Sequence, residues 1–454
     1  MIRIDLLPDD VLLDVFDYYT NLYSAHNKPR VEGWQLLVHV CRRWRNLVLG
    51  SPRRLNLQLF YTPKTPARYT LNVWPPLPLI VGGYMVPTSG TGNVIAALGQ
   101  SNRVCFVDLF LAGWQLEEVL AAMQVPFPEL TKLRLISNGL TLLVIPDSFL
   151  DGSAPRLQSI ELCGIPFPGL PRLLLSATHL VTLRLINIPH SGYMSPESIV
   201  ALLSVLSSLE KLVLRFQSPQ SRPDRASRRP PPSQRSVIPA LTSLLFNGVL
   251  EYLEDLVTGI DTPQLDGMDI TFFNQIDFDI PRLAQFINRT PKLRAPDAHV
   301  QFHDYFASVG LSPGSRTLEI AISCREPDWQ LSFIEQLCNF SLNSLFTVED
   351  LYIKHGYSQL VWKDEAIEHT LWLQLLLPFT AVKNLYLSKE CSPGIAAALQ
   401  ELVGSRITAV LPSLQNIFVK GLEPSGSFQE NIGQFVAARQ LSDHPITIID
   451  WETK

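Results

Sequence analysis

The sequence has 454 residues, of which 46% are hydrophobic and only 17% are charged. Charged residues make up about 25% of an ordinary soluble domain. Because 72 of the residues are leucines, a generally disordered chain is excluded. The 37 lysines and arginines against 42 acidic residues give a net charge of −5 at pH 7. That balance excludes a strongly basic surface over the whole chain, so we expect no nucleic-acid partner and no binding to an anionic membrane.

Cysteine spacing and the first residues bear on the cellular compartment. Six cysteines are present, and no two of them stand two to four residues apart, which excludes zinc-finger and thioredoxin spacings. Acidic residues at Asp5, Asp9 and Asp10 interrupt the start before an apolar segment can form, so we expect no secretory signal. The longest uncharged stretch, 69–102, contains four prolines and does not suit a membrane-spanning helix. We therefore expect a cytoplasmic or nuclear protein, or one found in both places.

Two helical patterns occupy the first fifty residues. Pro8 suits the first turn of a helix, and the following acidic pair suits the positive end of its dipole. Apolar residues at helical spacing follow in residues 11–16 and form one stripe. After a polar spacer, a second apolar stripe begins at Trp34, and arginines lie between the residues of this second stripe. A unit of about 45 residues has a very small core, which supplies little stability by itself. We therefore expect this unit to need a partner surface.

These fifty residues resemble a known family. Residues 7–16 read Leu-Pro-x-Asp-x-Leu-Leu-x-x-Phe, and residues 34–44 read Trp-x-x-Leu-x-x-Val-Cys-Arg-Arg-Trp. This pattern, over residues 5–50, resembles an F-box, the helical module by which substrate receptors dock on the Skp adaptor of cullin–RING ubiquitin ligases. The resemblance implies adaptor contacts or module core for Leu7, Pro8, Val11, Leu12, Val15, Phe16, Val40, Cys41 and Trp44. The alternative is a plain helical cap at the end of a repeat array.

A leucine-rich pattern repeats through the rest of the chain. The template L-x-x-L-x-L, with apolar substitutions, has a mean spacing of about 28 residues, within the range of leucine-rich repeats. Its copies begin at residues 104, 130, 157, 180, 209, 241, 265, 293, 318, 348, 382 and 414, the copies at 293 and 318 being degenerate. The fold class expected is α/β: a helical F-box at 1–50, then an irregular leucine-rich-repeat solenoid at 51–454, with a curved parallel sheet and outer helices. An ordinary α/β domain is the alternative.

Helical patterns lie between the repeated strands. Ser195 followed by Pro196 predicts the capped start of one helix, and Asp279-Ile280-Pro281 similarly predicts the start of another. Further helices are predicted over residues 114–123, 329–340, 364–377, 393–403 and 428–441.

One segment interrupts the repeats. Residues 217–236 contain five arginines against one aspartate, and five prolines, with no apolar residue larger than alanine or proline. We expect a solvated, disordered basic insertion in one repeat. It has no aromatic residue for stacking on bases, so a projecting loop is favoured over a basic arm that contacts RNA or an acidic partner.

No catalytic motif is found. The signatures of phosphate loops, nucleophile elbows, zinc proteases and dinucleotide sites are absent from the sequence. His299 and His303 would share a face of a helix, but the apolar alternation of residues 298–302 favours a strand. The sequence therefore predicts no cofactor, no metal site and no enzyme activity.

The repeat pattern also predicts a target-binding face. The residue between the last two leucines of each copy should point away from the core, onto the inner face of the sheet. This column contains Arg134 and Arg184, which with Lys211 we expect to form a basic cluster, and then Tyr352, Tyr386 and Phe418, which we expect to form an exposed aromatic row. The alternative is that a loop or the tail at 446–449 folds over these rings.

Together with the F-box resemblance, these features predict a non-enzymatic protein. The resemblance implies the substrate-recognition subunit of an SCF-type (Skp–cullin–F-box) E3 ubiquitin ligase, with adaptor and cullin subunits and an unknown target protein as partners. The first alternative is a leucine-rich-repeat scaffold without a ligase. The second is an enzyme whose site the motifs do not reveal.

Overall fold

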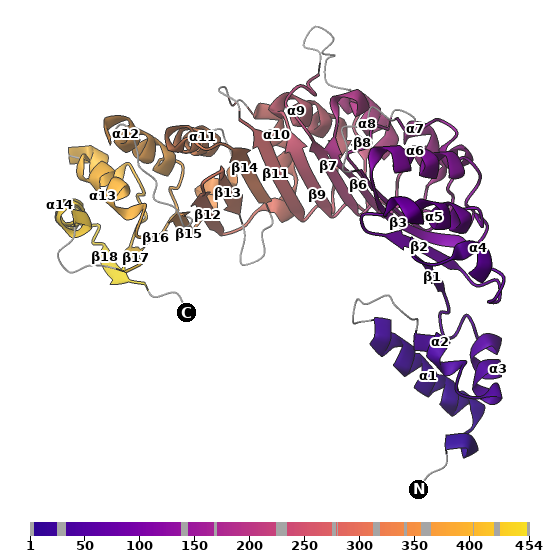
Figure 1. Cartoon of the computed structure of the whole chain (residues 1–454). Coiled ribbons are helices and arrows are strands. Elements are labelled where there is room, and N and C mark those ends of the chain that lie inside the picture. The colour runs from indigo at the N-terminus through magenta and orange to yellow at the C-terminus, as the bar shows by residue number, and fades with distance from the viewer. Residues whose placement is uncertain are drawn as a thin grey trace. The chain divides into compact units, whose positions relative to one another are not determined.

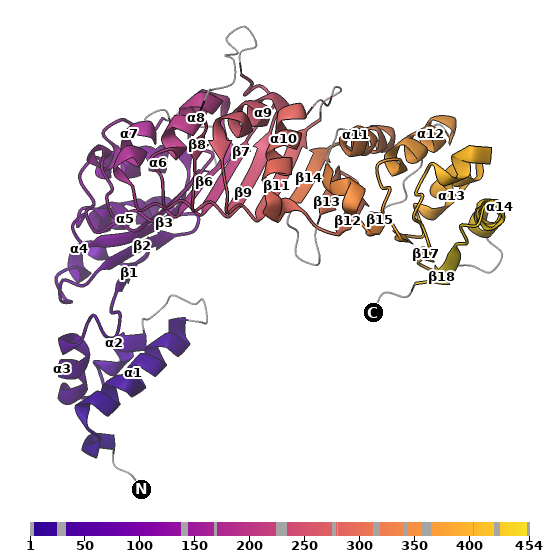
Figure 2. The ribbon, with the colours of Figure 1, turned by 180° about the vertical axis from the view of Figure 1, so that it is seen from behind.

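The computed structural model describes most of the chain (Figures 1 and 2). The described residues are 4–24, 33–137, 144–167, 170–223, 234–274, 278, 280–311, 318–339, 343–355, 365–402, 404–421 and 427–451. The chain divides into two compact units, Met1–Tyr193 and Met194–Lys454. The boundary predicted between residues 50 and 51 falls inside the first unit.

The first unit begins with a helical module, which we define as residues 4–50. It contains η1 (Ile4–Leu6), α1 (Asp9–Ser24), α2 (Gly33–Leu37) and α3 (Arg42–Gly50). Two aspartates stand in the first turn of α1, where they stabilise the positive end of the helix dipole. The thiol of Cys41 caps α3, accepting a hydrogen bond of 3.5 Å from the backbone N–H of Trp44.

Six strands follow in the part of the first unit that the structure describes, and neighbours in sequence pair in parallel. They are β1 (Leu59–Tyr61), β2 (Leu79–Gly83), β3 (Val104–Leu111), β4 (Lys132–Ser137), β5 (Ser159–Cys163) and β6 (Thr182–Ile188). The helices between them are α4 (Ala67–Thr70), η2 (Thr88–Gly90), α5 (Thr91–Leu98), α6 (Gly113–Ala122), η3 (Phe149–Gly152), α7 (Leu170–Ser176) and η4 (His190–Gly192). Helices α5, α6 and α7 lie together on one side of these strands (Figure 1).

Ten strands form the sheet among the described residues of the second unit. In spatial order they are β7 (Lys211–Phe216), β9 (Ser243–Gly248), β11 (Gly267–Phe273), β14 (Leu318–Ser323), β13 (Phe306–Leu311), β12 (Asp297–Phe302), β15 (Asp350–His355), β16 (Asn384–Leu387), β17 (Asn416–Val419) and β18 (Thr447–Asp450). The helices of this unit are α8 (Pro196–Leu203), α9 (Leu250–Gly259), α10 (Pro281–Arg289), η6 (Pro291–Leu293), α11 (Pro327–Asn339), η7 (Asn343–Thr347), α12 (Glu365–Leu376), α13 (Ser392–Gln400), η8 (Gly404–Thr408) and α14 (Ser427–Leu441).

The repeat pattern marks the core correctly. Its last two positions are buried in strand after strand, as in Leu133, Leu135, Ile160, Leu162, Leu183, Leu185, Leu212, Leu214, Leu385 and Leu387. The predicted helices are present, with ends that differ by a few residues from the predicted ones. Ser195 caps α8 as expected, because its hydroxyl accepts a hydrogen bond of 3.3 Å from the N–H of Ser198. The result is an α/β fold of mostly parallel strands alternating with helices, consistent with a leucine-rich-repeat-like solenoid.

One part of the predicted parallel sheet is wrong. The copies at 293 and 318 were expected to be consecutive parallel repeats, but a third strand, β13, lies between β12 and β14 and is antiparallel to both. Chain order is therefore reversed there, with β14 beside β11 and β12 beside β15. The physical reason is the connection from β12 to β13, residues 303–305, because a parallel connection needs a crossover of about a dozen residues or more.

Both ends of the predicted basic insertion belong to the fold. Ser221 is buried, and the guanidinium of Arg222 lies 3.9 Å from the carboxylate of Glu251. At the other end, β8 (Ser236–Val237) pairs with β10 (Ile260–Asp261). The predicted bounds 217–236 are therefore too wide, since backbone pairing and burial hold these flanks. Residues 224–233, the centre of the insertion, lie outside the described residues.

Candidate interaction surfaces

The motif residues of the helical module divide between core and surface. Leu12 and Phe16 are fully buried, and the ring of Phe16 packs against Trp44 with centroids 4.7 Å apart. Leu7 and Trp44 are half-buried. The exposed members are Pro8, Val11, Val15, Val40 and Cys41. The predicted division of these side chains into a core set and a surface set is therefore present.

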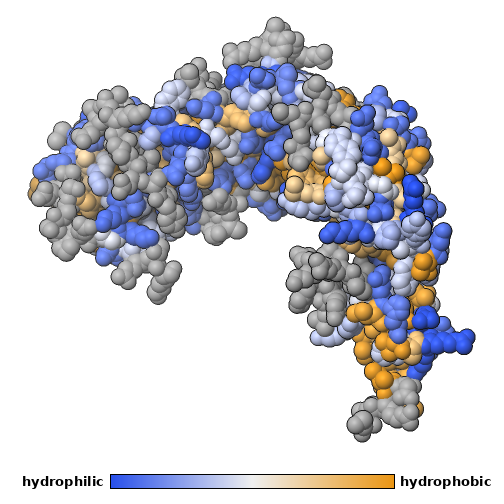
Figure 3. Space-filling view, viewed as in Figure 1, coloured by the Kyte–Doolittle hydropathy of each residue, from blue (hydrophilic) through white to orange (hydrophobic). Residues whose placement is uncertain are grey.

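The exposed apolar side chains of α1 share one face. Val11 and Val15 are four residues apart and Tyr18 is three further on, so helical geometry places them within a narrow stripe. They are 40%, 45% and 69% exposed. Hydrophobic residues gather visibly over this module (Figure 3). Tyr18 was not among the residues predicted for this surface, although its spacing from Val11 and Val15 places it on the same face of a helix. Three other exposed apolar residues of the module, not predicted either, are Ile4, Leu6 and Leu36.

Polar contacts fix the Leu-Pro segment at the start of α1. The guanidinium of Arg43, on α3, donates to the backbone carbonyl of Leu7 at 2.6 Å and to the carboxylate of Asp9 at 3.0 Å. On another side of the module, the indole N–H of Trp34 donates to the carbonyl of Gln58 at 3.0 Å, and its ring packs edge-on against Trp74. The module therefore joins the repeats through Trp34 and leaves the α1 stripe in contact with solvent.

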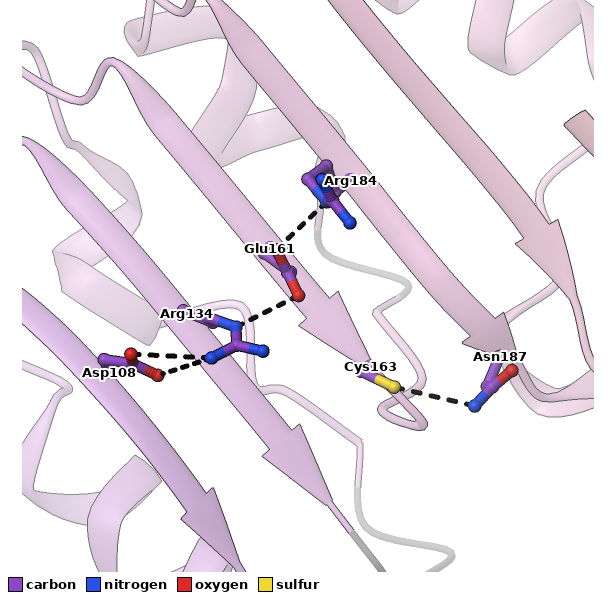
Figure 4. Close-up of polar contacts among 6 residues, drawn as sticks. All are labelled: Asp108, Arg134, Glu161, Cys163, Arg184 and Asn187. Atoms are coloured by element: carbon purple, nitrogen blue, oxygen red, sulfur yellow. Dashed lines mark hydrogen bonds and ion pairs between the residues drawn. The ribbon is translucent and has the colours of Figure 1, made fainter. Parts of the chain in front are cut away.

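A ladder of alternating charges crosses the sheet of the first unit (Figure 4). Arg134 on β4 lies 3.2 Å from Asp108 on β3 and 3.1 Å from Glu161 on β5. Glu161 also pairs with Arg184 on β6 at 3.0 Å. Two arginines and two carboxylates neutralise each other, so the basic cluster predicted for Arg134 and Arg184 is absent. Lys211, its third predicted member, lies on β7 of the second unit.

The predicted aromatic row forms a continuous stack on the sheet of the second unit. Strand register places Tyr352, Tyr386 and Phe418 side by side on β15, β16 and β17. Their ring centroids are 4.2 and 4.5 Å apart, and neighbouring planes differ by 10° and 9°. His299 on β12 extends the stack, 4.6 Å from Tyr352. We name these four residues the aromatic ladder.

The aromatic ladder is half-buried, whereas an exposed row was predicted for Tyr352, Tyr386 and Phe418. Its cover is the indole of Trp451, directly after β18, whose centroid lies 5.2 Å from Tyr386 and 6.2 Å from Tyr352. The tail itself adds β18 beside β17 instead of folding over the rings. The alternative, that the tail at 446–449 covers the rings, is thus correct in part. One side chain covers them, and it belongs to Trp451, which lies just after the predicted segment.

A row of carboxylates and amides runs beside the ladder. Asn416 donates from its side chain to the side-chain oxygen of Asn384 at 2.8 Å, and Asn384 donates to the carboxylate of Asp350 at 2.7 Å. Asp297 is the register neighbour of Asp350. Burial and the charge of Asp350 raise the pKa of Asp297 above its ordinary value. Burial, then the neighbouring Tyr386 and the carboxylates of Asp350 and Asp297, raise the pKa of Tyr352 to about 12.

Two lysines lie on the other side of the ladder. The ammonium of Lys354 lies 5.2 Å from the centroid of Tyr352 and 5.7 Å from that of Trp451. Burial, and then the charge of Lys420, lower the pKa of Lys354. Among the described residues neither lysine has a carboxylate partner. The Lys354 cation beside the aromatic rings, with the charge of Lys420 nearby, favours an anionic, aromatic ligand.

The two histidines considered for metal binding do not come together. His299 stacks on Tyr352, and His303 stacks on Phe306 at 4.2 Å. Within the part of the chain that the structure describes, no group of three His, Cys, Asp or Glu side chains is arranged to hold a metal ion. No helix there combines the length and apolarity needed to cross a bilayer.

Comparison with known proteins adds no relative. No protein-family model matches the chain, and no curated protein is detectably similar to it in sequence.

Proposed function

We propose that this chain is the substrate-recognition subunit of an SCF-type E3 ubiquitin ligase. The helical module docks on the Skp adaptor, and the repeats hold a target protein. The observation that carries the proposal is the apolar stripe of Val11, Val15 and Tyr18, exposed beside the Leu7-Pro8 segment. Contiguous exposed apolar side chains of this kind are typical of protein–protein interfaces.

The packing of the module supports docking through this face. Leu12 and Phe16 supply a small core, and Arg43 holds the backbone of Leu7 in place. The interface is thereby pre-organised, which lowers the ordering cost of binding. In this role the chain performs no chemistry itself. It raises the effective concentration of target lysines near the ubiquitin-charged subunit.

A scaffold without a ligase is the second candidate, with the module as a cap on the repeats. The contacts of Trp34 with Gln58 and Trp74 favour a capping role for that side of the module. A cap gives no reason for Val11 and Val15 to face solvent on the other side, so we favour docking.

The test is affinity purification of the tagged full chain from cells, with identification of its partners. The comparison variant carries Val11→Asp and Val15→Asp, and the matched control carries Val125→Asp, at an equally exposed valine outside the module. Recovery of a Skp adaptor and a cullin with the wild type and the control, but not with the double variant, supports the proposal. Recovery of other partners without adaptor or cullin supports the scaffold.

A further inference from the structure

Trp451 occupies the aromatic ladder in the manner of a ligand. Its ring makes an edge-to-face contact with that of Tyr386, with an interplanar angle of 66°, and the Lys354 ammonium lies near the rings of both Trp451 and Tyr352. Trp451 follows Asp450, the β18 residue that pairs with Val419, and its ring contacts Tyr386 on β16 and Tyr352 on β15. The indole thus fills a binding position on rings that belong to two other strands.

The strand directly before Trp451, β18, is weakly held in the sheet. In β16 and β17 every second side chain is buried, whereas no side chain of β18 is: Thr447 and Asp450 are exposed, and Ile448 and Ile449 are half-buried. Backbone pairing with β17 holds the strand, and the indole of Trp451 packs on the ladder directly after it. Segments with few buried contacts open most easily.

The stacking geometry limits what the surface can bind. Because the rings lie nearly parallel at 4.2–4.6 Å, each inner ring presents its faces to its neighbours and only its edge to a ligand. A sugar would need open ring faces, which Tyr352 and Tyr386 do not offer. A ring that lays its face against these edges, as the T-shaped contact of Trp451 with Tyr386 does, fits the ladder. Lys354 and Lys420 add a preference for negative charge next to that ring.

We propose that the aromatic ladder with Lys354 and Lys420 binds an extended acidic peptide that carries an aromatic residue. The segment from Thr447 to Trp451 is an internal competitor for this site, and the peptide displaces it. The peptide pairs with β17 as a parallel strand and sets its aromatic ring where Trp451 lies. The assignment of this peptide to a ubiquitination target rests on the proposed function. The binding of the peptide to the ladder does not depend on that function.

The experiment measures peptide binding by fluorescence anisotropy. The probe is a labelled peptide with the sequence of residues 446–454, Ile-Thr-Ile-Ile-Asp-Trp-Glu-Thr-Lys, and its control has alanine for tryptophan. The proteins are the full chain, its Trp451→Ala variant and a chain that ends at Pro445. We expect binding at least about tenfold tighter to the two variants than to the wild type, because a tethered competitor acts at an effective millimolar concentration. The control peptide should bind none of them tightly.

Further variants locate the site. In the Trp451→Ala background, Tyr386→Ala and Lys354→Ala should each weaken binding of the probe about tenfold or more. Tyr305→Ala, at an exposed tyrosine outside the ladder, should leave it unchanged. Circular dichroism and the melting temperature identify any variant that fails to fold, and the Trp451→Ala variant keeps the whole backbone.

Three outcomes would overturn the proposal. One is that folded Trp451→Ala protein binds the probe no more tightly than the wild type does. Another is equal binding of the probe and its alanine control. The third is a dimer of the full chain that is lost on removing residues 446–454, which would make a second copy the occupant. Binding of the purified adaptor, measured on the same variants, should not change, so failure here is distinct from failure of the ligase assignment.

Discussion

The carboxylate of Glu254 accepts a hydrogen bond of 2.6 Å from the backbone N–H of Leu283. Glu254 lies on α9 and Leu283 lies in the first turn of α10, so a side chain of one repeat caps the helix of the next. Glu254 is only 4% exposed, and the local N-cap residue, Ile280, has no side chain able to accept this bond. Neighbouring repeats are therefore joined by polar contacts as well as by leucine packing.

Replacing Glu254 should lower stability. In Glu254→Ala the buried N–H groups at the start of α10 lose their acceptor, at a cost of about 2 kcal/mol. We expect the melting temperature to fall by roughly 5 °C. The matched control is Asp266→Ala, at an exposed carboxylate between the same two helices, which should change it little. Equal melting temperatures for the two variants would show that the cap is unimportant.

Arg439 makes a similar contact near the carboxyl end of the chain. Its fully buried guanidinium donates to the carbonyls of Ile407, Leu411, Pro412 and Leu414, each at 3.3 Å. In Arg439→Ala these carbonyls lose a charged donor, and we expect a loss of about 3 kcal/mol. Hydrogen exchange in α14 should accelerate, whereas exposed Arg406→Ala should leave it unchanged. Undiminished protection of α14 in Arg439→Ala would contradict this role.

Asp297 should make stability depend on pH. Because burial and Asp350 raise its pKa, the folded protein disfavours the ionised carboxyl. The protonated Asp297 carboxyl therefore contributes to the stability of the fold in full below its ordinary pKa. This contribution to stability is lost as the pH rises through the higher pKa of the folded state. Asp297→Asn removes this loss and offers Asp350 an amide donor, as Asn384 does. We expect a higher melting temperature than wild type at pH 7 and a smaller difference at pH 4. The control is Asp304→Asn, at an exposed carboxylate, and its melting temperature relative to wild type should not change between these pH values. If the melting-temperature difference between Asp297→Asn and wild type is the same at both pH values, the raised pKa of Asp297 is not its cause.

The repeated strands and helices could be predicted because their leucines follow the burial period of each element. The reversed order of β12, β13 and β14 could not be read from that pattern, which carries no strand direction. Its signal was the three-residue connection 303–305. Similarly, Asp108 and Glu161 flank Arg134 in neighbouring repeats, so the neutral ladder could have been found by reading across strands.

The aromatic ladder was predictable because period-2 alternation places one residue per strand in the same column. Its cover was not, since Trp451 lies beyond the repeat pattern and reaches the ladder from a neighbouring row. The capping carboxylate of Glu254 was missed for a related reason. Helix caps are read from local sequence, and this one comes from the preceding repeat.

The most direct test of the docking claim is the affinity of the purified chain for a purified Skp adaptor, measured by calorimetry. Leu7→Ala combined with Pro8→Ala removes two anchors beside the α1 stripe, at about 2 kcal/mol each, while leaving the repeats folded. We expect the dissociation constant of this double variant to rise about a thousandfold. The control Val125→Asp should bind as the wild type does. A wild-type chain that does not bind the adaptor, or a double variant that binds it equally well, would contradict docking through this module.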